Sequence, residues 1–517
     1  MDRVARHLAA DKVIPPVRRL AEQALSRTAG APLIPGNEIR LLKDAKENYP
    51  AWLEAMRSAK KSIHFESFII HEDDIGEQFS QVLAAKAQEG VSVRLIYDWL
   101  GAFGKTSRKF WERLKVAGVE VRCFNPFRFD NPVSWLSRDH RKMISVDGEI
   151  GFVTGLCVGR MWVGHPERGI EPWRDTGVVL RGPALADVER AFADIWATMG
   201  STLPEDEIPR RETIPAAGDV TLQVVASIPN TAGLYRLDQF ITAIARKSLW
   251  LTDAYFVGMV PYVQSLSAAA RDGVDVRLLV PGSTDIPVLR ALSRAGYQPL
   301  LEAGARVFEW NGPMIHAKTA VADGRWARVG STNLNVASWI GNYELDVAVE
   351  NEAFAQAMEE LYLDDLGHAT EIVLNERQKV RPIKRRASRS LLRPRLAEGS
   401  VSRAGASAIR ISNTVGAAIA NRRVLGPAEA RIMGSAGMIL LLLTIAGLLW
   451  PRWVVIPFSV ITGWLAISLF VRAFKLHRKR SLEIGDRSGL INSRPARHAA
   501  AKNRRRIRKR RDQGAVQ

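Results

Sequence analysis

The chain has 517 residues, of which 47% are hydrophobic, enough for two or three domains with full-sized cores. Its two cysteines, Cys123 and Cys157, have no paired spacing and argue against a disulfide framework or a structural zinc site. The formal net charge of +19 suggests an anionic partner, but residues 1–376 sum to −7, whereas residues 377–432 and 475–517 each carry +12. The basic charge therefore belongs to two C-terminal segments.

The first 34 residues form a segment of their own. Residues 1–30 alternate basic and apolar positions and are interrupted at Pro15-Pro16. This pattern is typical of a surface helix that packs on the following domain.

From about Pro35 the apolar pattern alternates between the periods of helix and strand. It predicts a helix at 50–61, a buried strand at 62–70, a helix at 75–90, and strands at 91–98 and 119–124.

The same order of elements then returns at an offset of 183 to 186 residues. KSLWLTDAYFV (247–257), GVDVRLLV (273–280) and GARVFEW (304–310) repeat the three strands of the first series. A repeat of this length indicates a duplicated domain, since solenoid units are much shorter. We therefore expect one α/β domain over residues 35–212 and a second over residues 213–376.

Each repeat contains the same motif after these strands, His-x-Lys-x-x-x-x-Asp. Its members are His140, Lys142 and Asp147 in the first half and His316, Lys318 and Asp323 in the second, followed there by Ser331 and Asn333. One such match would be weak evidence, but two matches after equivalent series of elements are strong.

These residue types suit phosphodiester chemistry. A histidine whose second ring nitrogen is held by a carboxylate can attack phosphorus, and a second histidine can protonate the leaving alkoxide. Lys142 and Lys318 would place positive charge against the phosphate oxygens, and Ser331 and Asn333 would add uncharged donors. We expect this site to need no metal and no cofactor. The motif aspartates stand at strand ends, where a structural role is favoured over proton transfer.

The motifs resemble those of the phospholipase D superfamily, and the order of features is most similar to its bacterial cardiolipin synthase branch. The resemblance covers roughly residues 35–375 and includes PWRDT (172–176), GSTN (330–333) and NYELD (342–346). It implies two pseudo-symmetric α/β domains, each a mixed sheet flanked by helices, that meet at one active site. It also implies a covalent phosphohistidine intermediate.

The resemblance further assigns roles to individual residues. His140 and His316 would be nucleophile and general acid/base, with His140 the nucleophile in the commoner family arrangement. In the family, an acidic residue about thirty positions after each histidine hydrogen-bonds that histidine. Asp175 would therefore orient His140, and Glu344 would orient His316.

One stretch of the first half departs from the family pattern. Thr154, Gly155, Leu156 and Cys157 stand where the pattern has Gly, Gly or Ser, any residue, and Asn. Cys157 has no amide group to donate, so phosphate support in this half would depend on Thr154 and on backbone groups.

Two apolar runs, 433–450 and 453–471, are each about long enough to cross a bilayer. They predict a transmembrane hairpin over residues 433–474, between a basic linker (377–432) and a basic tail (475–517). The positive charge on both sides would place the catalytic domains in the bacterial cytoplasm, at the inner membrane. A hairpin confined to one leaflet and a buried soluble helix pair are the alternatives.

Together these features predict a membrane-anchored phosphatidyltransferase that transfers a phosphatidyl group between phospholipids such as phosphatidylglycerol. A phospholipase D-type hydrolase, with water as acceptor, would use the same intermediate. The basic run at 502–511 would suit a nucleic-acid phosphodiesterase, but the acidic catalytic portion and the apolar hairpin argue against nucleic acid. A non-catalytic scaffold is suggested only by Cys157.

Overall fold

The computed structural model describes residues 16–127, 137–374 and 380–382, together with individual positions between 438 and 470. The predicted basic tail lies outside these residues, and the predicted linker and membrane hairpin lie almost wholly outside them. No helix within the described part is both long and apolar enough to cross a membrane.

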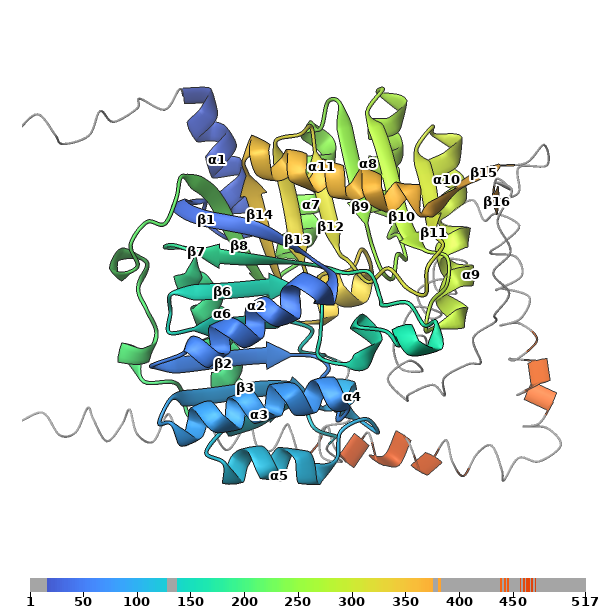
Figure 1. Cartoon of the computed structure of the whole chain (residues 1–517). Helices are drawn as coiled ribbons and strands as arrows, with labels where there is room; N and C mark the ends of the chain where they lie inside the picture. The colour runs from blue at the N-terminus through green and yellow to red at the C-terminus, as the bar shows by residue number, and fades with distance from the viewer. Residues whose placement is uncertain are drawn as a thin grey trace, which may run out of the picture. The chain divides into compact units, whose positions relative to one another are not determined.

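The first half contains seven strands and the helices that cover them (Figure 1). Its elements are β1 (Ile34–Lys43), α2 (Asp44–Ser58), β2 (Ser62–Ser67), α3 (Asp74–Gln88), β3 (Ser92–Asp98), α4 (Trp99–Ala102), α5 (Arg108–Val116), β4 (Glu120–Phe124), β5 (Lys142–Val146), β6 (Ile150–Thr154), β7 (Thr176–Arg181) and α6 (Leu185–Thr198). The strands and helices predicted for this half are confirmed, with ends that move by a few residues.

The second half repeats this series and adds a short C-terminal extension. Its elements are β8 (Val220–Ser227), α7 (Gly233–Ile244), β9 (Ser248–Thr252), α8 (Val260–Arg271), β10 (Asp275–Pro281), α9 (Pro287–Ala295), α10 (Tyr297–Glu302), β11 (Arg306–Trp310), β12 (Thr319–Ala322), β13 (Trp326–Gly330), β14 (Glu344–Glu350), α11 (Glu352–Gly367), β15 (Ala369–Leu374) and β16 (Val380–Pro382). The three strands predicted from the repeat are β9, β10 and β11.

All the described strands belong to one mixed sheet. Their order is β16-β15-β11-β10-β9-β12-β13-β14-β8-β1-β7-β6-β5-β2-β3-β4. Read outward from the centre, β1-β7-β6-β5-β2-β3-β4 has the same order and the same parallel and antiparallel pairings as β8-β14-β13-β12-β9-β10-β11. The duplication read from the sequence is therefore a duplication of topology.

Strand β1 joins the halves because it pairs with β7 on one side and with β8 on the other. The halves also share one cluster of buried apolar side chains, which includes Val178 of β7, Phe192 of α6, Leu345 of β14 and Met358 of α11. Two further clusters lie under the remaining helices of each half. The predicted division at residue 212 is thus a boundary between repeats that share a core.

The N-terminal helix α1 (Pro16–Ala29) packs on the second half. Its Leu25 and Ala29 are buried beside Leu234 and Leu237 of α7. The backbone carbonyl of Thr28 accepts a hydrogen bond from Arg236 at 3.1 Å. The helix begins at Pro16, a residue suited to the first turn of a helix because its missing N–H costs no hydrogen bond there.

Candidate active site

The two histidines lie at the seam between the halves. The end of β2 pairs with the start of β5 (Ser67 with Lys142), which brings His140 to the carboxyl edge of the parallel strands. The end of β9 does the same for His316. The backbone N–H of His140 donates to Tyr343 O at 2.9 Å, and that of His316 donates to Arg174 O at 2.7 Å. Each histidine is therefore held by the backbone of the other half.

The carboxylates that orient the histidines are also exchanged between the halves. His140 Nδ1 lies 2.8 Å from Glu344 Oε2, and His316 Nδ1 lies 2.8 Å from Asp175 Oδ2. A carboxylate accepts the Nδ1 proton, so Nε2 of each ring is left as the reactive nitrogen. The two carboxylates were expected on the sequence, but their assignment to the histidine of the same half was wrong. The backbone pairing across the seam is the cause, since it places the start of β14 beside His140.

Burial is the main reason why both imidazoles are weak bases. It lowers the pKa of His140 to about 4, with Glu344 acting to raise it and Lys142 and Lys318 to lower it further. It lowers the pKa of His316 to about 3, in the same direction as Lys318 and Lys142 and against Asp175. Both rings are thus neutral near pH 7. Because each histidine feels the lysine of the opposite half, the two half-sites form one site.

The orienting carboxylates stay ionised although they are completely buried. Burial acts to raise the pKa of Asp175, but the charge and hydrogen bond of His316, the charge of Lys318 and a hydrogen bond from Trp162 bring it below its usual range. The pKa of Glu344 is likewise lowered against burial, chiefly by His140. An ionised partner favours the imidazolium form of each histidine when a proton must be carried.

Both motif lysines are buried, with side chains turned back toward their histidines. Lys142 Nζ and Lys318 Nζ each donate to the carbonyl oxygen of the histidine two residues earlier. Lys318 Nζ additionally lies 2.9 Å from Nδ1 and 3.0 Å from Nε2 of His316. Burial lowers the pKa of Lys318 to about 8. The two lysines give the pair of histidines the positive surroundings that an anion would need.

Of the two phosphate donors predicted after β13, only one has a side-chain donor that is still available for a phosphate. The Ser331 hydroxyl donates to Glu344 Oε2 at 2.6 Å and accepts from the backbone N–H of Leu345 at 2.9 Å. Its proton is committed to the orienting carboxylate, so the prediction that Ser331 binds phosphate directly is corrected. Asn333 has only a 3.5 Å contact from Nδ2 to Ser338, and its Oδ1 is buried without a hydrogen-bond partner in the described residues. Asn333 remains the candidate donor.

Cys157 stands in the first half where Asn333 stands in the second. It is buried, and burial raises the pKa of its thiol even though Lys142 and Lys318 act to lower it. The effect of both lysines places this thiol beside the site. Its backbone carbonyl accepts from the Tyr49 hydroxyl at 2.7 Å. Cys157 is thus a small neutral group, and the departure from the family pattern removes one amide donor from the site.

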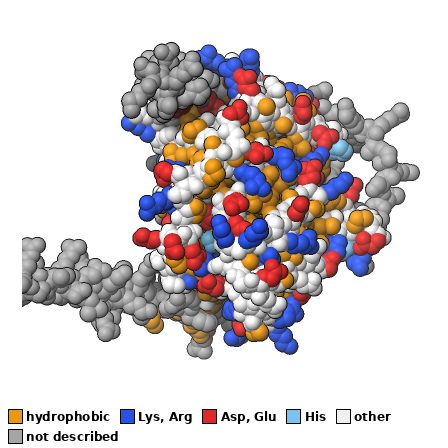
Figure 2. Space-filling view, turned by 60° about the vertical axis from the view of Figure 1, so that its left-hand side comes forward, with side chains coloured by type: hydrophobic (Ala, Val, Ile, Leu, Met, Phe, Trp, Pro, Cys, Tyr) orange, Lys and Arg blue, Asp and Glu red, His pale blue; other side chains and the backbone are white. Residues whose placement is uncertain are grey.

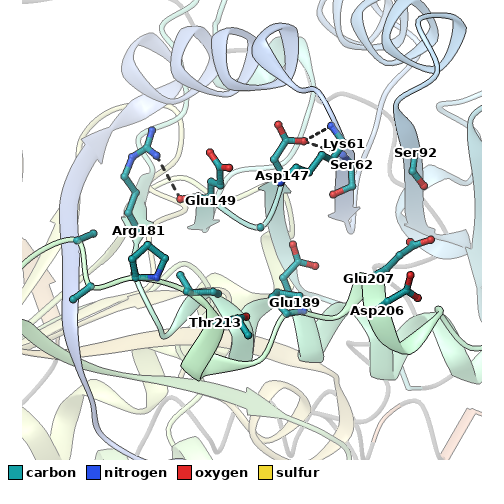
Figure 3. A pocket seen from close by; sticks show the side chains of 17 residues that line it. Lys61, Ser62, Ser92, Asp147, Glu149, Arg181, Glu189, Asp206, Glu207 and Thr213 are labelled. Atoms are coloured by element: carbon teal, nitrogen blue, oxygen red, sulfur yellow. Dashed lines mark hydrogen bonds between the residues drawn. The ribbon is translucent and has the colours of Figure 1, made fainter.

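The motif aspartates lie at the far end of their hairpins. Asp147 comes five residues after Lys142, so at the rise of a strand it lies about 16 Å from the lysine. Its carboxylate accepts from the backbone N–H groups of Lys60, Lys61 and Ser62 at 2.7 to 2.9 Å, which anchors the start of β2. Asp147 also lines a cavity of about 710 Å³ together with Ser62 and Ser92, the first residues of β2 and β3 (Figure 3). Asp147 belongs to the repeated motif, and these contacts give it the structural role that its place at a strand end favoured.

Asp323 occupies the equivalent turn in the second half. It accepts from the backbone N–H groups of Arg246, Lys247 and Ser248 at 2.7 to 3.2 Å. Partial burial acts to raise its pKa, but these three amides bring it below the usual range. Both aspartates have positive φ angles, +57° and +54°, which aspartate tolerates better than most residues. Asp323 is structural for the same reason as Asp147.

Several residues of the site were not predicted from the sequence. Arg174, next to Asp175, is buried and forms ion pairs with Asp44 at 3.1 Å and with Asp365 at 2.8 Å, the latter from the second half. Trp162 donates its indole N–H to Asp175 at 3.0 Å. The arginine inside the PWRDT segment could have pointed to Arg174. No sequence pattern pointed to Trp162. No group of three or more His, Cys, Asp or Glu side chains in the described residues is placed to hold a metal ion.

The two α/β repeats and the two carboxylate-held histidines at their seam define an enzyme of the phospholipase D superfamily. The family model described as "Cardiolipin synthase, PLD-like domain" matches residues 52–196 and 240–366. The chain belongs to this family.

Individual relatives support the same membership. A cardiolipin synthase of Alkalihalophilus pseudofirmus is 33% identical over 345 residues, which cover 66% of this chain and 68% of that protein. Cardiolipin synthase A of Pseudomonas fluorescens is 33% identical over 371 residues, 69% of this chain and 74% of that one. The crystal structure of phosphatidylserine synthase from Haemophilus influenzae aligns with a TM-score of 0.54 and 14% identity over 68% of this chain and 92% of that chain, a likeness of fold.

Proposed function

We propose that the protein is a membrane-anchored phosphatidyltransferase that makes cardiolipin through a phosphohistidine intermediate. The observation that carries this proposal is the pair of buried, neutral histidines, each held through Nδ1 by a carboxylate of the other half. The cardiolipin synthases to which the chain is similar supply the substrate class.

In the first step, His140 Nε2 attacks the phosphorus of a donor such as phosphatidylglycerol. The bond from phosphorus to the glycerol oxygen breaks, and His316 gives that oxygen a proton. The negative phosphodiester favours the imidazolium form that His316 needs for this task. Glycerol leaves, and the phosphatidyl group is held on nitrogen.

In the second step, His316 takes a proton from the hydroxyl of a second lipid, whose oxygen attacks phosphorus. The phosphorus–nitrogen bond breaks, which returns His140 to its starting form. Lys142 and Lys318 stabilise the charge on the phosphoryl oxygens in both steps. Asn333 adds an uncharged donor.

Membrane anchoring through residues 433–474, with the catalytic halves on the cytoplasmic side, is part of the proposal. It is supported by the two apolar runs and the basic residues on both sides of them. An anchor would keep the site near both lipids, and an apolar surrounding would favour a lipid hydroxyl over water as acceptor. On the face drawn in Figure 2, acidic and basic side chains are interspersed, which does not suggest a nucleic-acid groove.

The test is to incubate membranes that contain the protein with labelled phosphatidylglycerol and to separate the products. Cardiolipin with an equimolar amount of glycerol is expected, whereas phosphatidic acid alone would indicate a hydrolase. His140→Ala and His316→Ala should each abolish turnover. His368→Ala is the matched control, because the His368 side chain is exposed and its Nδ1 lies 3.2 Å from the carbonyl oxygen of Asp364, next to the end of α11. Cleavage of single-stranded DNA without lipid turnover would overturn the substrate class.

A further inference from the structure

The two orienting carboxylates have the same pattern of hydrogen bonds, built from different residues. In the second half, one oxygen of Glu344 is shared by His140 Nδ1 at 2.8 Å and the Ser331 hydroxyl at 2.6 Å. Its other oxygen faces Asn342 Nδ2 at 3.3 Å. A neutral donor thus holds the oxygen that binds the histidine.

The first half has no hydroxyl at the equivalent place. Gly155 occupies the position of Ser331, and its N–H donates to Thr176 O at 3.0 Å just as that of Ser331 donates to Leu345 O at 3.0 Å. A Cβ atom on Gly155 would come within 2.2 Å of Asp175 Oδ1. The carboxylate of Asp175 therefore fills the space that a serine side chain would need.

Trp162 supplies the missing donor. Its Nε1–H bonds Asp175 Oδ2 at 3.0 Å, the same oxygen that His316 Nδ1 contacts at 2.8 Å. The other oxygen, Oδ1, accepts from the backbone N–H of Thr176 at 2.9 Å. Each carboxylate thus has one oxygen shared by a histidine and a neutral donor.

The segment that leads to Trp162 is fixed by two hydrogen bonds. The Tyr49 hydroxyl bonds the carbonyl of Cys157, and the N–H of Arg160 donates to Asp73 at 2.7 Å. The indole itself is fully buried, and its ring meets that of His316 nearly at right angles, with 5.8 Å between centroids. A donor held this firmly leaves Asp175 little freedom to turn away from His316.

We propose that Trp162 is a positioning residue for phosphatidyl transfer, which holds Asp175 so that Asp175 can orient His316. This inference rests on the proposed function only in that His316 must carry a proton. Trp162 donates to its carboxylate as Ser331 does in the other half. The indole N–H of Trp162 therefore replaces the hydroxyl that is missing at Gly155.

The test compares Trp162→Phe with Trp52→Phe. Trp52 is also a fully buried tryptophan of the first half, but its Nε1 has no hydrogen-bond partner in the described residues. Loss of the bond to Asp175 should lower kcat about 10-fold or more, as for other groups that orient a reactive histidine, with little change in KM. It should also move the acidic limb of the pH profile to higher pH, because Asp175 loses a donor to its ionised form. Trp52→Phe should leave both unchanged.

Two further variants make the test independent of folding losses. In an Asp175→Asn background, Trp162→Phe should cause no additional loss, because its route to His316 has already been removed. In Gly155→Ala the added Cβ presses on Oδ1 of Asp175. This variant should therefore shift the acidic limb of the pH profile in the same direction as Trp162→Phe. An effect of Trp162→Phe no larger than that of Trp52→Phe, or one that adds fully to that of Asp175→Asn, would overturn the proposal.

The pH profiles are measured with labelled phosphatidylglycerol and also with bis(p-nitrophenyl) phosphate, whose hydrolysis needs the histidines but no lipid acceptor. If the chromogenic diester is cleaved and no cardiolipin forms, the proposed function fails, and the Trp162 variants still support or overturn this inference on the diester alone.

Discussion

The half-site around His140 and the half-site around His316 share one strand topology but differ in most of the side chains around the ring. His140 packs against Phe68, with 5.1 Å between ring centroids. His316 is bounded by the rings of Trp162, Trp173 and Tyr255 at 5.7 to 5.9 Å. The duplicated fold therefore repeats the position of the histidine while its surroundings have diverged.

The difference extends to the charged groups. Lys318 Nζ contacts the ring nitrogens of His316, whereas Lys142 bonds only the carbonyl of His140 among the polar contacts of the described residues. Arg141, buried beside His140, donates to the carbonyls of Ala191 and Ser227 from a position where the second half has alanine. Because attack on phosphorus and proton transfer are different tasks, two unlike environments allow one histidine to be specialised for each.

The largest expected effect separates attack on phosphorus from proton transfer. With phosphatidyl-p-nitrophenol, the nitrophenolate leaves without needing a proton, so His316→Ala should still form the adduct and release one burst of nitrophenolate. His140→Ala should lower that burst on the order of 1,000-fold or more, because the nucleophile is gone. Rapid-quench measurement of the burst and of acid-labile label on the protein checks both. A burst retained by His140→Ala and lost by His316→Ala would reverse the assignment.

The crossed carboxylates give the next largest effect. In the His316→Ala background, Glu344→Gln should slow the burst about 10- to 100-fold, since Glu344 holds the remaining His140. Asp175→Asn should have little effect there, because its histidine is absent. Carboxylates paired within each half would give the opposite pattern, with Asp175→Asn as the slow variant.

The comparison of halves also explains what could be predicted from the sequence. The repeat, the strands and the histidines could be found because each depends on a local pattern, such as the apolar period of β2 or the fixed spacing from His140 to Lys142. The partner of each carboxylate could not be found, because it depends on how the two halves meet along the seam. The same holds for Trp162, whose bond to Asp175 follows from the path of a loop rather than from any spacing.

The motif aspartates show the converse limit. Asp147 and Asp323 occur at a constant spacing from their lysines, which groups them with the motif although their places at strand ends favoured a structural role. A five-residue separation along a strand instead carries them to the other end of the hairpin. A regular spacing in sequence thus reports a repeated structure, and only the period of the element tells which members share a site.

A smaller effect should follow from the different surroundings of the two motif lysines. Burial lowers the pKa of Lys318 to about 8, so its charge is present below that pH and is lost as the pH rises through it. We expect the KM for phosphatidylglycerol to rise about 10-fold across this range, the cost of one charge-assisted hydrogen bond. Lys318→Arg stays charged and should remove this alkaline rise. An identical alkaline rise in wild type and Lys318→Arg would show that another group is responsible.

The smallest effect is expected at the far ends of the hairpins, where the halves are most alike. Asp147→Asn keeps a residue that tolerates positive φ but loses the charge and one of two acceptor oxygens, so the free energy of unfolding should fall by about 1–2 kcal/mol. Asp323→Asn should do the same, and neither should change kcat, since the two carboxylates accept from backbone amides next to the start of β2 or β9, far from the histidines. Denaturant unfolding and the lipid assay check the two parts separately. A variant with normal stability but lower kcat would return that aspartate to the catalytic group and would mean that the two ends of the hairpin are coupled.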